Sequence, residues 1–221
     1  MKKHLIQFVI LLLSTTCFSQ NDFSYGIKAG VNFASAHGEA SDSNSQIGYD
    51  ESRTSFHAGV ISELSLSNKF SLQTELLYSQ VGVNYAYDNR PADGAKVDSD
   101  LNLDYITLAI LGKYQVYKSL SIEAGPQLGY ILNANVEQNR SFFSQIGGGS
   151  ETVFNEKNDI KDDINNFDFG FALGSSYELN NGLFIQLRYV LGLSEIPKNE
   201  NQTLSTDLKN AVFQLSLGYK F

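Results

Sequence analysis

Hydrophobic and polar residues alternate along much of this chain, and its last twelve residues show the pattern most clearly. In "NAVFQLSLGYKF" (210–221), apolar side chains occupy every second position and the chain ends on Phe221. Such alternation places one set of side chains on each face of a β-strand. Because soluble proteins usually leave their last residues polar and loosely held, this ending predicts a strand that the fold requires.

The same alternation recurs in seven earlier segments. The eight predicted strands cover residues 24–33, 55–66, 70–82, 104–116, 120–132, 166–179, 183–193 and 210–221. They reach the roughly 9–11 residues that a strand needs to cross a bilayer, whereas strands of soluble proteins typically run to about 5–6 residues. Beyond the N-terminal segment, no stretch approaches the roughly 18 apolar residues of a transmembrane helix.

The connections between these strands alternate in length. Tight turns are predicted at 67–69, 117–119 and 180–182, and long polar connections at 37–52, 84–100, 136–163 and 196–209. Outer-membrane barrels have short periplasmic turns and longer extracellular loops. The sequence therefore predicts an all-β fold, an eight-stranded antiparallel transmembrane β-barrel with four long extracellular loops and both termini on the periplasmic side.

A soluble β-sandwich or a lipocalin-like barrel would also alternate polar and apolar residues. Two features favour the membrane barrel: the polar face is rich in glycine, serine and charges of both signs, and the aromatic residues gather near the two strand ends, as in the girdles of membrane barrels. The predicted girdles are Tyr25, Phe70, Tyr114, Tyr177, Tyr219 and Phe221 at one end, and Phe33, Phe56, Tyr78, Tyr130 and Phe167 at the other.

The first nineteen residues have the pattern of a secretory signal peptide. Lys2 and Lys3 precede the short apolar run 5–13, and cleavage after Ser19 would leave the barrel domain at 20–221. The only cysteine, Cys17, would be removed with the signal, so the mature chain would form no disulfide. Acylation of Cys17, as in a lipoprotein, is the competing interpretation.

Five segments resemble the PorT-like, porin-family outer-membrane β-barrel proteins of Bacteroidetes. They are "LQTELLYSQVG" (72–82), "YITLAILGKY" (105–114), "IEAGPQLGYIL" (122–132), "LRYVLGL" (187–193) and "FQLSLGYKF" (213–221). Thr74 stands where that family often has proline, and Thr107 and Ala109 replace its common Glu and Pro. The resemblance covers essentially the whole mature chain and implies an outer-membrane location, but it implies no reaction.

Charged residues recur on the face predicted to line the barrel. They are Lys28, Glu63, Glu75, Lys113, Glu123, Asp168, Glu178, Arg188 and Lys220. The bore of an eight-stranded barrel is only wide enough for side chains to fill it, and unpaired buried charges are costly. We therefore expect a salt-bridged plug, with a narrow ion path as the alternative and a catalytic pair of carboxylates as a third hypothesis.

The sequence carries no catalytic or metal-binding pattern. His37, opening the first long loop, and His57, on the inward face of the second strand, are both predicted towards the extracellular rim. Ser41, Asp42 and Ser43 follow His37, but without the spacing of a known membrane-enzyme site. With two histidines and no cysteine in the mature chain, a transition-metal site is not expected. The acidic stretch 158–166 lacks the spacing of a calcium loop. We expect no enzyme activity, no metal and no cofactor.

Charge and location set the expected partners. The formal net charge of −8 argues against nucleic acid, which requires clustered basic residues. The expected partners are outer-membrane lipid and lipopolysaccharide, with the barrel-assembly machinery and periplasmic chaperones during biogenesis. Leu215, Leu217, Tyr219 and Phe221 form the expected assembly signal. The predicted function is a structural or surface-interaction role in the outer membrane, with acidic extracellular loops displayed on a salt-bridged barrel. The first alternative is a small pore of low conductance, and the second is a membrane-embedded enzyme of the acyltransferase or protease type.

Overall fold

The computed structural model of the chain describes residues 23–37, 50–88, 95–144, 150–194 and 209–221. Within these residues lie nine β-strands and one short 3-10 helix. They are β1 (Phe23–His37), β2 (Asp50–Ser65), β3 (Phe70–Asp88), β4 (Ala95–Tyr117), β5 (Leu120–Ser144), β6 (Ser150–Asp159), η2 (Lys161–Asp163), β7 (Phe167–Glu178), β8 (Leu183–Gly192) and β9 (Lys209–Lys220). No helix among the described residues is long and apolar enough to span a membrane.

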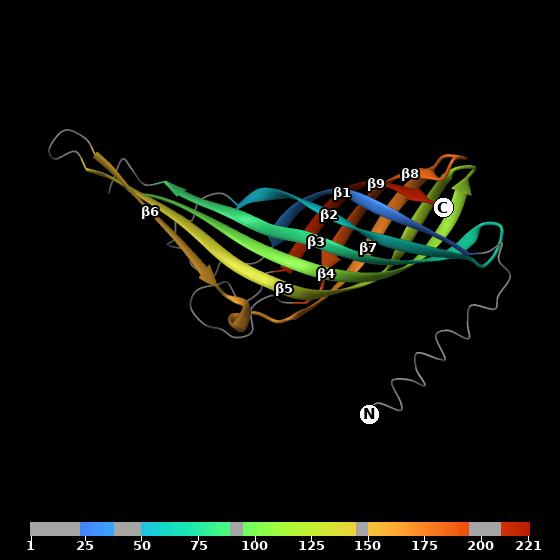
Figure 1. Cartoon of the computed structure of the whole chain (residues 1–221), viewed down its shortest axis with the longest axis horizontal. Coiled ribbons are helices and arrows are strands. Elements are labelled where there is room, and N and C mark those ends of the chain that lie inside the picture. Colours follow the sequence, from blue (N-terminus) through green and yellow to red (C-terminus); the bar gives the residue numbers. More distant parts are fainter. Residues whose placement is uncertain (1–22, 38–49, 89–94, 145–149, 195–208) are drawn as a thin grey trace, which may run out of the picture.

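Eight of the strands close into an antiparallel ring (Figure 1). Neighbours in the chain pair with each other, β5 pairs with β7, and β9 returns to pair with β1. Closure follows from the sequence of the last strand, because Leu215 lies opposite Val31 and Leu217 opposite Ala29, which continues the apolar outer row across the seam. A closed ring leaves no free edge in the barrel wall.

The three longest strands of the ring, β3, β4 and β5, continue beyond it and form a protruding sheet together with β6. It comprises residues 80–88 of β3, 95–104 of β4, 133–144 of β5 and 150–159 of β6, and it extends away from the end where the chain terminates (Figure 1). Strand β6 pairs only with β5. We call the end of the barrel that carries the tight turns the turn end, and the opposite end the loop end.

All eight strands predicted from the alternation are present, and so are the three tight turns. The predictions for two long connections are wrong. Most of 84–100 is paired strand, with Asn84 opposite Asp100, and 136–163 contains the end of β5, all of β6 and η2. The prediction missed these strands because their outward row is polar, while their apolar residues, such as Leu101 and Leu103, lie on the inward face. Of the other two predicted loops, 38–49 and 195–208 lie outside the described residues.

The outer wall of the ring is apolar, as the parity of each strand predicts. Its exposed residues include Ile27, Val60, Leu76, Leu108 and Leu187. Aromatic rings meet at both ends of this wall: Tyr25 contacts Phe221 at a centroid distance of 5.4 Å, and Tyr130 contacts Phe167 at 5.2 Å. The arrangement matches the two aromatic girdles of a membrane barrel.

Candidate functional site in the barrel interior

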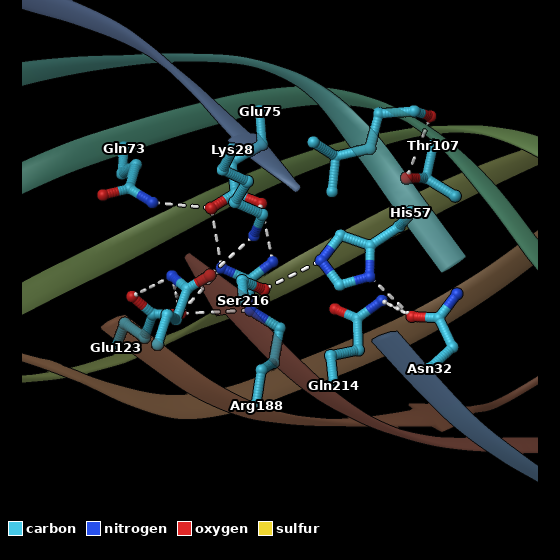
Figure 2. Close-up of polar contacts among 12 residues, drawn as sticks. Lys28, Asn32, His57, Gln73, Glu75, Thr107, Glu123, Arg188, Gln214 and Ser216 are labelled. Carbon is cyan, nitrogen blue, oxygen red and sulfur yellow. Dashed lines mark hydrogen bonds and ion pairs between the residues drawn. The ribbon is translucent and has the colours of Figure 1, made fainter. Parts of the chain in front are cut away.

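The centre of the bore is occupied by a buried ion-pair cluster around Arg188 (Figure 2). The Arg188 guanidinium donates to both oxygens of Glu75 at 2.6 and 2.7 Å, and to Glu123 Oε1 at 2.7 Å. Lys28 Nζ donates to Glu75 Oε2 at 2.8 Å. Two cations thus face two carboxylates, and the side chains of Lys28, Glu75 and Arg188 are fully shielded from solvent.

Two glutamines complete the hydrogen bonding of this cluster. Gln186 accepts from Lys28 at 2.6 Å and donates to both oxygens of Glu123, while Gln73 donates to Glu75 Oε1 at 2.6 Å. Both amides are 1% exposed. Buried ions need such additional partners, because their mutual attraction alone seldom repays the loss of hydration. The sequence shows both residues on the inward parity, but the charge pattern did not single them out.

A second group of charges lies towards the turn end. Lys220 donates to Glu178 Oε2 at 2.6 Å and also to Glu63, and Lys113 donates to Glu63 Oε2 at 3.2 Å. These side chains line an open basin of about 840 Å³ at the turn end. Lys220, on the last strand, therefore links strands β2 and β7 across the bore.

The ninth predicted charge, Asp168, lies apart from both groups, towards the loop end. Among the described residues it forms no ion pair, and its carboxylate accepts hydrogen bonds from Asn210 Nδ2 at 3.0 Å and Ser194 Oγ at 2.7 Å. Asp168, Asn210 and Tyr105 line a cavity of about 30 Å³, which is room for one or two water molecules. The structure thus brings eight of the nine predicted charges into two groups and leaves Asp168 separate.

His57 faces the barrel interior, as its position on the inward face of the second strand predicts, but it lies deeper than the predicted extracellular rim. Its Nδ1 is 2.8 Å from Asn32 Oδ1 and its Nε2 is 2.8 Å from Ser216 Oγ, with Gln214 donating to the same Asn32 oxygen at 3.0 Å (Figure 2). The Ser216 hydroxyl, the His57 imidazole and the Asn32 amide are arranged in the order of a catalytic triad, in which a base activates a nucleophile and a third group orients the base. His57 is 0% and Ser216 2% exposed, so no substrate reaches them in this structure.

The loop-end part of the bore is largely apolar, which the sequence analysis did not foresee, and the hydrogen-bonded group of Asp168, Asn210 and Tyr105 is its polar exception. Leu103, Ile131, Ile164 and Val212 pack there with other inward-facing residues as a continuous buried cluster. An apolar layer of this kind blocks water and ions as a hydrophobic constriction does. The interior therefore consists of two layers, a charged layer from the turn end to the middle and an apolar layer towards the loop end.

The described residues contain no cluster of metal-binding side chains. No group of three or more His, Cys, Asp or Glu side chains within them could hold an ion. His37 closes strand β1, but its side chain lies outside the described part, as do Ser41, Asp42 and Ser43. The interior is thus suited to a rigid, hydrogen-bonded filling of the barrel.

Comparison with known proteins agrees with this architecture. Residues 18–197 match the family model described as "Outer membrane protein beta-barrel domain". No curated protein matches the chain. Among solved structures, the chain is similar to Ail, the attachment invasion locus protein of Yersinia pestis, with 10% identity, a TM-score of 0.46 and coverage of 90% of this chain and 99% of Ail.

Two further solved structures are similar. Neisserial surface protein A has 13% identity and a TM-score of 0.46, with coverage of 89% of this chain and 97% of that one. The outer membrane protein OprG from Pseudomonas aeruginosa has 12% identity and a TM-score of 0.39, with coverage of 90% and 95%. The family match spans most of the chain, and the closed ring with its apolar wall agrees with it. The chain is an outer-membrane protein and belongs to the outer membrane protein β-barrel domain family.

Proposed function

We propose that this protein is a closed membrane body that presents the protruding sheet for contact at the cell surface. Short turns of outer-membrane barrels face the periplasm and longer connections face outward, so the sheet would stand outside the cell. The PorT-like subgroup and the cleaved signal peptide are further parts of this proposal, supported by the strand motifs and by the pattern of residues 1–19.

The observation that carries the proposal is the filling of the bore. An ion crossing it would have to separate Arg188 from Glu75 and then pass the apolar layer at Leu103 and Ile131. Separating a buried pair leaves an uncompensated charge, which costs several kcal/mol. Either layer alone would obstruct conduction, and the two lie in series.

Planar-bilayer recording of the refolded protein tests this proposal against the pore alternative. We expect no discrete openings from the wild type, and none from Arg188→Ala, since the apolar layer remains in place. An open porin recorded in the same bilayers provides the positive control. Regular openings of the wild type would refute the closed body and favour the small pore.

We also propose that the chain is not an enzyme, because the Ser216–His57–Asn32 series is sealed within the wall. Lipid and peptide turnover by the wild type would be compared with His57→Ala. Turnover that this substitution abolished would overturn the proposal.

A further inference from the structure

The outward face of the protruding sheet carries an unusual concentration of carboxamide groups. Residues directly opposite each other on paired strands point to the same face. The register therefore aligns Asn102 with Asn135, and Asn139 with both Asp98 and Asn155. We call this surface the amide face, and its asparagines are Asn84, Asn102, Asn133, Asn135, Asn139 and Asn155.

The amide face forms a regular lattice. Strands lie about 4.8 Å apart and successive rows on one face about 6.7 Å apart. Four rows follow one another from the barrel outward. The first row is Gln80, Asp104 and Asn133, and the second is Asn102, Asn135 and Asp159. The third row is Asn84, Asp100, Glu137 and Lys157, and the fourth is Asp98, Asn139 and Asn155. These rows hold no large apolar side chain.

Much of this lattice has unused hydrogen-bonding capacity. In the first row Asp104 accepts from Gln80 at 2.9 Å and from Asn133 at 3.3 Å, and farther out Lys157 donates to Glu137 at 2.7 Å. This hydrogen bond and the charge of Lys157 lower the pKa of Glu137. Within the described part of the chain, the amides of Asn102, Asn135, Asn139 and Asn155 form no hydrogen bond with other side chains or backbone groups.

The amide face is continuous with the wall that faces lipid. On β4 the outward row runs from Leu108 and Ile106 directly to Asp104 and Asn102. On β3 the change occurs at Tyr78, whose hydroxyl accepts from Gln80 at 3.1 Å. Aromatic girdles mark the membrane–water interface. The lattice therefore begins at the level of the lipid headgroups and rises roughly 20 Å above it over three row spacings.

From this placement we propose that the amide face binds the sugar headgroups of outer-leaflet glycolipid. Carboxamides donate and accept hydrogen bonds at once, and sugar hydroxyls do the same. The four rows lack the hydrophobic core typical of protein interfaces, and the next row outward adds only one apolar side chain, the exposed Val153 beside Ser141. The inference deepens the proposed function by naming a partner for the displayed sheet, and it rests on the sheet lying outside the cell.

Titration with the soluble oligosaccharide of lipopolysaccharide, freed of its acyl chains and phosphates, tests this proposal, because the carboxylates of the face would repel phosphate. Without acyl chains the probe cannot adhere to the apolar wall, so calorimetric binding to the detergent-solubilised protein reports on polar surfaces. We expect the wild type to bind and the double variant Asn102→Thr/Asn135→Thr to lose at least about tenfold in affinity, because several hydrogen bonds disappear. Threonine favours strands, so the sheet should persist.

The matched control is Gln138→Thr, on the opposite face of β5, which should bind as the wild type does. Heat-modifiable migration on a gel verifies that each variant is folded. Absence of wild-type binding, or equal binding by the double variant, would overturn the inference. Retention of polylysine but not of the oligosaccharide would also overturn it, by identifying a cationic partner. Channel recording is independent of these titrations, so openings would refute the closed body whatever the oligosaccharide does.

Discussion

Arg188 is the side chain on which the charged layer depends. It is 1% exposed and bridges Glu75 on β3 to Glu123 on β5 from its own position on β8. Its planar guanidinium engages both oxygens of Glu75 at once, a geometry that lysine cannot reproduce. A single residue thus ties together three strands that are distant in the sequence.

Replacing Arg188 by methionine should destabilise the barrel by about 3–5 kcal/mol, because two carboxylates would remain buried beside only one cation. Urea unfolding in phospholipid vesicles measures the change. Adding Glu75→Gln to Arg188→Met should recover part of the loss, since it removes one of the stranded charges. The control Lys157→Met breaks the exposed pair with Glu137 and should leave stability almost unchanged. A comparable loss in both single variants would show that burial is not what makes Arg188 important.

Among the elements, the seam between β1 and β9 is the junction that converts a sheet into a barrel. The strands approach closely where Gly30 faces Ser216, and a Cβ on Gly30 would lie 2.1 Å from Leu215 O and 2.7 Å from His57 Cε1. Beyond the last strand residue, Phe221 N donates to Tyr25 O at 2.8 Å. The seam therefore depends on backbone proximity at Gly30 and on the final aromatic residue.

Gly30→Ala should weaken the seam by about 1–3 kcal/mol, the usual cost of forcing extra atoms into a packed interior. The matched control is Gly112→Ala on β4, where the nearest atom to the added Cβ would be Phe70 Cζ at 3.5 Å, an ordinary contact. Both variants are measured by the temperature at which heat-modifiable migration is lost. Equal temperatures for Gly30→Ala and the wild type would contradict the close approach.

As a whole molecule, the protein is asymmetric along the barrel axis. Connections at the turn end are short, whereas at the loop end four strands rise into the protruding sheet (Figure 1). The interior follows the same axis, from the charged layer at the turn end to the apolar layer near the loop end. The two ends of the protein therefore present different chemistry to the two sides of the membrane.

This asymmetry predicts which single cysteines a membrane-impermeant reagent reaches on intact cells. Cysteine at Asn158, on β6, should be labelled, and cysteine at Asn180, in the β7–β8 turn, should be labelled only after the outer membrane is permeabilised. The proposed cleavage after Ser19 would remove Cys17, so the wild-type protein would supply an unreactive background. Labelling of the Asn180 position on intact cells would reverse the orientation.

The sequence by itself determined the barrel, because each strand that faces lipid outside and polar groups inside carries a two-residue period. That period predicted the eight strands, the three turns, the outer aromatic rows and the residue numbers of the nine inward charges. It failed for the upper parts of β3 to β6, where the outward row is polar and the apolar residues, such as Val83, Leu101 and Leu103, lie on the inward face.

Only the tertiary structure decided how the inward residues combine. Partners such as Lys28 and Gln186, or His57 and Ser216, lie more than a hundred residues apart and meet through the register of the closed ring. The same closure separated Asp168 from the other charges and placed the apolar layer on the loop-end side of them. A local pattern specifies the face on which a side chain lies. Its neighbours across the bore depend on the stagger between strands, and that stagger is set by all the strand pairings of the closed barrel together.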